Sequence, residues 1–164
     1  MDPKDLRQRI ERVKAMFPKA HTALIQALHE VRWTYGYLHP EGIRLVSEVL
    51  GIGEGEIRDV ASFYQYFKFT PLGKYHFRIC TNITCMIHGA YDLMAHLKNR
   101  LGIEPGQVTE DGLFSYEEFE CIGCGDRPPA ILINDTRVEG VTTDTLDDLI
   151  ERAKKGDLDL STNS

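Results

Sequence analysis

The sequence lacks any apolar run long enough to span a bilayer, so no membrane-inserted segment is predicted among its 164 residues. Residues 1–5 hold neither the apolar core of a signal peptide nor the arginines of a transit peptide. Basic residues are not in excess either: the net charge is −6, which argues against a nucleic-acid partner. These absences lead us to expect a cytoplasmic protein with no direct membrane insertion.

Patterns of side chains that make or break covalent bonds are missing as well. We find no nucleophile–base pair, no phosphate-binding glycine loop and no pair of catalytic carboxylates. We therefore expect no catalytic residues in this chain. A hydrophobic fraction of 42% and a charged fraction of 27% are ordinary for a globular protein, and 164 residues suffice to bury a real core.

Cysteine is scarce, and its placement is the most informative feature of the chain. The four cysteines form two close pairs, Cys80 and Cys85 with C-x4-C spacing and Cys121 and Cys124 with C-x2-C spacing. A reducing compartment disfavours structural disulfides. Four thiolates on two short loops can bind a metal centre with little loss of backbone entropy. The spacing therefore indicates a metal or redox site made from these four residues.

Three kinds of site remain open on spacing alone. Both spacings occur among the ligands of two-iron clusters, and Gly123 and Gly125 would let backbone N–H groups approach the sulfurs. Structural zinc also takes four thiolates, which would make the chain a zinc-stabilised protein-interaction module. A thiol–disulfide enzyme would use only the second cysteine pair, as its C-x-x-C motif, and would leave the first pair idle.

Helical periodicity dominates the first seventy residues. Apolar side chains recur at intervals of three and four, and prolines and glycines mark the ends of the runs. The pattern predicts four helices, at 3–17, 24–35, 40–50 and 54–67. Their connections are short, so neighbouring helices should pack antiparallel. In the fourth helix, Tyr64 and Phe67 should point inward.

The periodicity changes after Gly73. Tyr75, Phe77 and Ile79 alternate with polar positions, which predicts a strand that ends at Cys80. Further along, the pattern predicts a helix at 90–101, strands at 114–120, 130–133 and 137–141, and a last helix capped by Thr143. The order is β-α-β-β-β-α, with a right-handed parallel crossover followed by an antiparallel hairpin.

The two patterns together predict an α+β chain. A helical bundle that docks a partner should cover 1–70, a thioredoxin-like β-α-β-β-β-α domain 71–156 and a polar tail 157–164. Cys85 should lie in the loop after the first strand and Cys121 in the loop after the second. Because both loops follow parallel strands, both should reach the same end of the sheet.

Six short segments add to the cysteine spacing. They are FPKA at 17–20, ALIQALH at 23–29, GYL at 36–38, VASFY at 60–64, CTNITC at 80–85 and ECIGCG at 120–125. Together they resemble the 24 kDa-type thioredoxin-like [2Fe–2S] subunit of respiratory complex I, the NADH:quinone oxidoreductase, from about Phe17 to Ala153. Related subunits serve in NAD-reducing hydrogenases and NAD-dependent formate dehydrogenases.

The resemblance implies that Cys80, Cys85, Cys121 and Cys124 bind one [2Fe–2S] cluster. It implies a tight pair with a larger flavoprotein that carries FMN and the NADH site, so that single electrons pass between cluster and FMN. The chain would then be a subunit of an NADH dehydrogenase, in the peripheral arm of a membrane-associated complex. The second cysteine pair departs from the family, where C-x3-C is usual, because this loop is one residue shorter.

Two further groups of residues have alternative interpretations. His76, His88 and His96 lie near the first cysteine loop and would be candidate ligands in a Rieske-like site. The aromatic residues at 63–69 either pack into the core at helical spacing or form a partner-facing surface, because aromatic side chains are enriched at interfaces.

Overall fold

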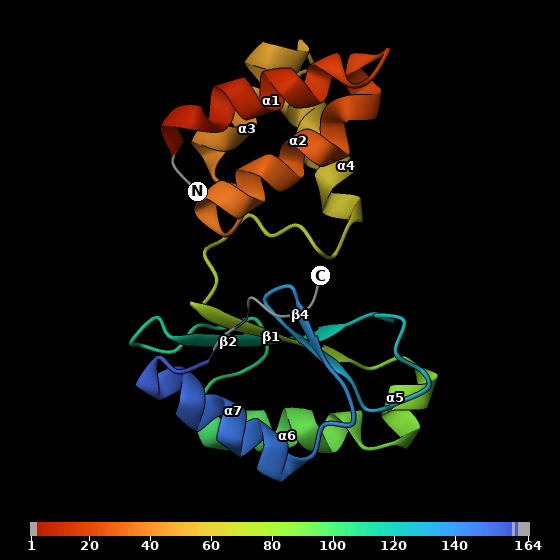
Figure 1. The fold of residues 1–164 in the computed structure, drawn as a ribbon, viewed down its shortest axis with the longest axis vertical. Coiled ribbons are helices and arrows are strands. Elements are labelled where there is room, and N and C mark those ends of the chain that lie inside the picture. The colour runs from red at the N-terminus through yellow and green to blue at the C-terminus, as the bar shows by residue number, and fades with distance from the viewer. Residues whose placement is uncertain (1–2, 159, 161–164) are drawn as a thin grey trace. The chain divides into compact units, whose positions relative to one another are not determined.

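The computed structural model describes residues 3–158 and 160 of the chain. It divides into two compact units, residues 1–71 and 72–164 (Figure 1). No helix among the described residues is long and apolar enough to cross a membrane. Each unit has its own hydrophobic core.

Helices are the regular elements of the first unit's described part. A single 3-10 turn precedes four α-helices: η1 (Pro3–Asp5), α1 (Leu6–Ala15), α2 (Ala20–Tyr35), α3 (Pro40–Leu50) and α4 (Glu54–Phe63). The predicted ends of α2 and α3 are confirmed, since Gly36 and Gly51 end them with φ of 83° and 72°. Those positive φ values are the left-handed conformation that favours glycine after a helix.

The end of the fourth helix differs from the prediction. α4 stops at Phe63, and Tyr64 already has an extended backbone and is 41% exposed, so its inward placement was wrong. Phe67 is buried as predicted, but it reaches the core from the segment after the helix. The backbone N–H of Leu38 donates to the carbonyl of Lys68 at 2.7 Å. This hydrogen bond joins residues 30 positions apart in the sequence and holds the segment after α4 in a non-helical conformation. The tertiary contact thus outweighs the helical spacing of the aromatic residues.

The second unit is a sheet covered on one face by two helices (Figure 1). Its elements are β1 (Tyr75–Cys80), α5 (Ile83–Ile87), α6 (Ala90–Leu101), β2 (Phe114–Phe119), β3 (Ile131–Ile133), β4 (Thr136–Val138) and α7 (Thr143–Lys155). The strand order is β2-β1-β3-β4. β1 and β2 are parallel, and β3 runs antiparallel to both β1 and β4. The predicted thioredoxin-like order is confirmed, with the short helix α5 added.

Alternation along the strands separates the two faces of this sheet. Tyr75, Phe77 and Ile79 of β1 belong to the hydrophobic core of the unit, together with Phe114 and Tyr116 of β2. α6 and α7 contribute the other side of this core, so they cover the same face. The intervening residues of both strands therefore project to the opposite face.

Smaller details of the second unit also differ from the sequence prediction. The last helix is capped by Thr142 rather than Thr143: the Thr142 hydroxyl oxygen accepts a hydrogen bond from the N–H of Thr145 at 3.1 Å. The second hairpin strand is three residues long and ends at Val138. Leu158 lies in the core of this unit, and the rest of the predicted tail falls partly outside the described residues.

Candidate metal centre

Parallel pairing of β1 with β2 brings the two cysteine segments to one edge of the sheet. Cys80 is the last residue of β1 and pairs with Phe119, the last residue of β2, two positions before Cys121. The N–H of Cys80 donates to Ala130 at 3.1 Å, and the N–H of Thr81 donates to Phe119 at 3.0 Å. These bonds hold the exit of β1 between its two neighbouring strands.

Cys85 lies on a helix rather than in a loop, contrary to the prediction. α5 spans Ile83–Ile87, and Asn82, with an extended backbone, precedes it as the N-cap residue. The helix buries Cys85 while Ile83 and Ile87 are 66% and 71% exposed. Five residues are too few to show a helical period in sequence, so the helix could not be recognised there.

Cys80 and Cys121 both affect the thiol of Cys85. The pKa of the Cys85 thiol is raised to about 11, and burial is the largest cause, followed by a hydrogen bond with Cys80. The charges of Cys80 and Cys121 act in the same direction. Cys80 and Cys85 are buried, whereas Cys121 is exposed. Cysteines from both predicted loops therefore lie at this end of the sheet.

Cys124, the fourth predicted ligand, has different charged neighbours. Its thiol is buried, which raises its pKa, and the charged side chains that act on it are those of Arg137 and Glu139. Its Sγ is 3.7 Å from the carbonyl oxygen of Ile122. The structure therefore places Cys124 beside Arg137 of β4 and Glu139, which follows that strand.

The loop around the second pair approaches the first closely. Gly123 has a φ of 78°, and its N–H donates to the sulfur of Cys121 at 3.4 Å. A Cβ atom on Gly125 would lie 4.0 Å from Oγ1 of Thr84, the residue before Cys85. Gly123 thus provides the left-handed backbone conformation of the turn. The lack of a side chain at Gly125 allows its loop to lie close to the segment of Thr84 and Cys85.

The donor set fits a two-iron cluster, since four cysteine sulfurs on two adjoining loops are the ligands that such clusters take. Within residues 3–158 and 160, no three His, Cys, Asp or Glu side chains stand in a metal-binding arrangement. The ligand assignment therefore stays a prediction.

The three candidate histidines have other partners. His76 bonds Ser115 at 2.8 Å through Nδ1 and Glu117 at 2.9 Å through Nε2, on the sheet face opposite α6 and α7. Nδ1 of His88 bonds the carbonyl of Thr84 at 2.7 Å, at the end of α5. His96 pairs with Asp147 across α6 and α7 at 3.1 Å. These contacts give the histidines structural roles.

One group beside the cysteines was missed by the sequence reasoning. Oε1 of Glu118 accepts hydrogen bonds from the hydroxyls of Thr81 at 2.9 Å and Tyr91 at 3.0 Å. The bond to Glu118 raises the pKa of the Tyr91 hydroxyl. Only the strand register, which pairs Glu118 with Ile79, could have shown that this side chain lies near the cysteine edge.

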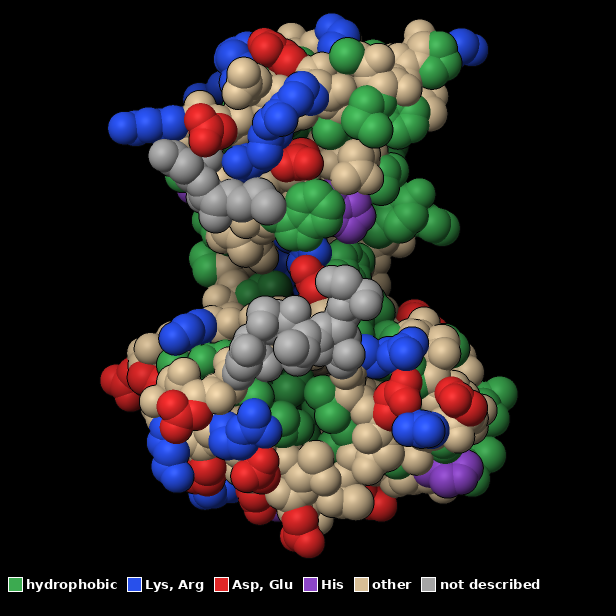
Figure 2. Space-filling view, in the orientation of Figure 1, with side chains coloured by type: hydrophobic (Ala, Val, Ile, Leu, Met, Phe, Trp, Pro, Cys, Tyr) green, Lys and Arg blue, Asp and Glu red, His purple; other side chains and the backbone are tan. Residues whose placement is uncertain are grey.

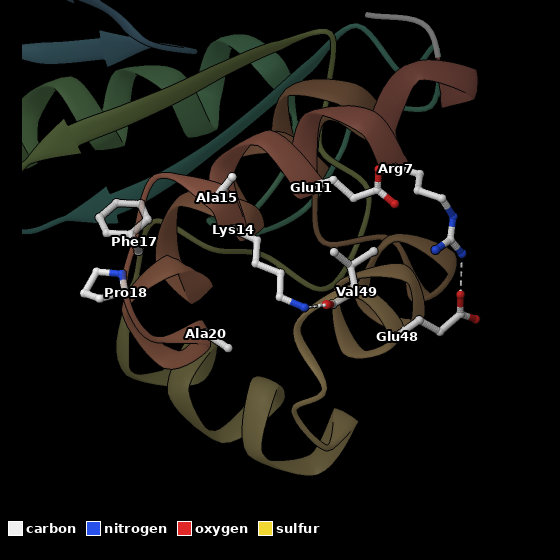
Figure 3. Close-up of a pocket in the computed structure, with 9 residues that line it drawn as sticks. All are labelled: Arg7, Glu11, Lys14, Ala15, Phe17, Pro18, Ala20, Glu48 and Val49. Carbon is white, nitrogen blue, oxygen red and sulfur yellow. Dashed lines mark hydrogen bonds and ion pairs between the residues drawn. The ribbon is translucent and has the colours of Figure 1, made fainter.

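A hollow on the first unit, between α1 and α3, is a different kind of surface (Figure 3). Across it, Arg7 pairs with Glu48 at 2.5 Å and Nζ of Lys14 donates to the carbonyl of Val49 at 2.6 Å. Its nine lining residues include no cysteine and no histidine. It therefore offers none of the ligands that a soft metal prefers.

Comparison with known proteins identifies the class. The family model of the thioredoxin-like [2Fe–2S] ferredoxins matches residues 10–154, and the chain belongs to that family. Among its relatives, the second subunit of the NADH-quinone oxidoreductase of Thermus thermophilus is 37% identical over 150 residues, covering 90% of this chain and 83% of the relative. The corresponding NADH-quinone oxidoreductase component of Aquifex aeolicus is 31% identical, covering 92% of this chain and 94% of the relative. The resemblance to complex I subunits is confirmed.

Solved structures agree with this membership. A chain of an NAD+-reducing [NiFe]-hydrogenase in the H2-reduced state superposes with a TM-score of 0.74 at 28% identity, over 86% of this chain. The air-oxidised state gives 0.72 at 30% identity, over 81%. In both cases this chain spans 23% of the length of the hydrogenase chain. The shared fold is thus one part of a larger polypeptide there.

Proposed function

We propose that this chain is an electron-transfer subunit that holds one [2Fe–2S] cluster through Cys80, Cys85, Cys121 and Cys124. The observation that carries the proposal is the parallel pairing of β1 with β2, which brings the segment of Cys80 and Cys85 and the segment of Cys121 to the same end of the sheet. Family membership supplies the kind of cluster. When bound, such a cluster supplies storage for one electron at a time.

The chain's own residues have three tasks in this role. Cys80 and Cys85 supply sulfurs from buried positions, which limits the access of water to that side of the site. The backbone N–H of Gly123 already points at the sulfur of Cys121, and such bonds stabilise negative charge on a ligand. Cys124 would supply the fourth sulfur, from the loop that also carries Cys121.

The partner in this proposal is a larger flavoprotein that carries FMN and oxidises NADH. One-electron storage requires a cofactor elsewhere that converts electron pairs, and this chain has no residues for hydride chemistry. The relatives are subunits of NADH-quinone oxidoreductases, which supports this assembly. We place the chain in the cytoplasmic, peripheral arm of such a membrane-associated complex.

The surface beside the cysteines suits a protein partner. Ile83, Met86 and Ile87 of α5 are 66%, 43% and 71% exposed, on the helix that buries Cys85. Figure 2 shows hydrophobic side chains on the surface at the right-hand edge, where Figure 1 places α5. Exposed apolar side chains gathered in one place are typical of interaction sites.

Metal analysis tests the cluster assignment. After anaerobic reconstitution of the full chain we expect iron, acid-labile sulfide and visible absorption, and an electron paramagnetic resonance signal after reduction with dithionite. Zinc without sulfide in a colourless protein would instead identify a zinc-stabilised interaction module. Thiol–disulfide exchange activity that survives Cys80→Ser would identify a redox enzyme of the second cysteine pair.

Co-purification tests the partner assignment. A tagged full chain, isolated from its own cells, should carry FMN in a fixed ratio to its iron. A chain that lacks residues 1–70 should keep the cluster absorption and lose most of the FMN, because we assign docking mainly to the helical unit. Equal FMN content in both preparations would contradict that assignment.

A further inference from the structure

Glu118 links three elements around the first cysteine segment. It is the penultimate residue of β2, and its Oε1 accepts hydrogen bonds from Thr81 at 2.9 Å and Tyr91 at 3.0 Å. Thr81 directly follows Cys80, and Tyr91 lies in the first turn of α6. One carboxylate therefore ties the exit of β1 and the start of α6 to β2.

These two bonds bracket the helix that carries Cys85. α5 spans Ile83–Ile87, so Thr81 and Tyr91 lie on either side of it in the chain. Between α5 and α6, Gly89 has a φ of 92°, a conformation that costs glycine little. Fixing both flanks of a short segment removes conformations in which its cysteine points elsewhere.

Glu118 also brings a negative charge next to the segment of Cys80 and Cys85. A glutamate carries a negative charge at neutral pH, and this carboxylate is hydrogen-bonded to the residue next to Cys80. Negative charge near an iron–sulfur cluster opposes the addition of an electron, which lowers the reduction potential. Glu118 is exposed, so solvent and salt weaken the effect without removing it.

We propose that Glu118 is a positioning residue of the cluster site, which holds the Cys80–Cys85 segment in place and lowers the reduction potential of the cluster. The inference rests on the proposed function, since it assumes that these cysteines are cluster ligands. It goes further by assigning a role to a side chain that is not a ligand. Its two parts, position and charge, can be separated by substitution.

Glu118→Gln tests the charge, because the amide oxygen can still accept from both hydroxyls. In a redox titration of the reconstituted chain, followed by electron paramagnetic resonance, we expect the variant to be reduced more easily. The ratio of reduced to oxidised cluster at a fixed potential should rise about threefold at low ionic strength. In about 1 M salt the difference should shrink, because the screening length falls to about 3 Å.

Glu110→Gln is the matched control for this titration. It removes the same charge from an exposed position before Phe114, and Phe114 pairs with Tyr75 at the edge of the sheet opposite Cys80. We expect its titration curve to follow that of the unaltered chain. An equal shift in both variants would mean that net charge alone is responsible, and it would overturn the assignment to Glu118.

Glu118→Ala tests the positioning, and this test needs no cluster. In the cluster-free chain, amide hydrogen exchange across residues 82–87 should be on the order of fivefold faster in Glu118→Ala. Exchange in Glu118→Gln should match the unaltered chain. Unchanged exchange in Glu118→Ala would overturn the positioning role, because the two hydrogen bonds would then not restrain the segment.

The outcomes for the inference and for the proposed function are distinguishable. A chain that assembles no iron–sulfur cluster refutes the proposed function, and the exchange measurement still decides whether Glu118 holds the segment. A chain that assembles the cluster, with identical potentials in Glu118→Gln and the unaltered protein, refutes the charge role alone. Faster exchange with Ala and easier reduction with Gln together support the whole inference.

Discussion

The two units of the chain divide charge and chemistry unequally. Residues 1–71 contain ten basic and nine acidic residues, a net charge of +1, and no cysteine. Residues 72–164 contain nine basic and 16 acidic residues, a net charge of −7, and all four cysteines. The first unit is a nearly neutral bundle held by aliphatic packing, and the second carries every predicted ligand.

The two units also differ in the source of their folding stability. The first unit buries Leu, Ile, Val and Ala side chains between helices, and nothing among its described residues calls for a cofactor. The second includes Cys80, Cys85 and Cys124 in its core, so cluster binding and folding are coupled in the proposed function. Substitutions in the two units should therefore have separable effects.

The largest effect is expected from Cys80→Ser in the second unit. This change removes a buried ligand, so iron-dependent visible absorption should be lost. The melting temperature of the second unit should fall by about 4–8 °C for each kcal/mol of binding energy lost, as is typical of a domain of this size. Iron analysis and calorimetry would measure both quantities. An unchanged melting temperature would argue against coupling between ligand binding and folding.

The counterpart in the first unit is Leu28→Ala. Leu28 is fully buried in α2, and such truncations cost about 2–5 kcal/mol because a cavity is left. We expect denaturant unfolding of the helical unit at lower concentration, with the cluster absorption of the second unit retained. Simultaneous loss of both signals would show that the two units unfold as one cooperative block.

Two glycine substitutions sharpen the comparison at a smaller scale. A Cβ on Gly73, just before β1, would lie 2.4 Å from the backbone carbon of Phe114, so Gly73→Ala should cost about 1–3 kcal/mol. Gly55 is the second residue of α4 and has open space around it, so Gly55→Ala should stabilise the first unit, by at most about 0.5 kcal/mol because the position is in the first turn. Urea titrations of both variants should show midpoints that move in opposite directions.

The smallest effect is expected from Asp147→Asn on α7. His96 and Arg100 of α6 hold the pKa of Asp147 below its ordinary value. A lowered folded-state pKa contributes stability at neutral pH, and this contribution is lost as the pH falls below 3.8 through the folded value. The variant should therefore melt slightly earlier at pH 7 and match the unaltered chain near pH 2. A difference that persists in acid would point to packing instead.

The fold could be predicted from the sequence in segments where the apolar positions repeat several times. The helices around Leu28 and Val46 and the strand at Tyr75 repeat their apolar positions several times, so pattern alone located them. The end of α4 was missed because the segment after Phe63 leaves the helix and its Lys68 accepts a backbone hydrogen bond from Leu38. Such contacts depend on residues far apart in the sequence.

The candidate site was predictable in its residues and not in its arrangement. Spacing and family resemblance selected Cys80, Cys85 and their partners, because four cysteines in two pairs admit few uses. The short helix under Cys85, the contacts of Cys124 with Arg137 and the bonds of Glu118 were not predicted. Each follows from strand register or loop packing, which only three-dimensional structure reveals.

The parallel register of β1 and β2 has a consequence for variation in chain length. α6 runs from the cysteine edge back toward the start of β2, so its connection to β2, residues 102–113, lies at the far edge near Tyr75. Insertions or deletions there would leave the ligands where they are. A change in the length of this connection therefore alters the sequence distance between the two cysteine pairs without moving the ends of β1 and β2.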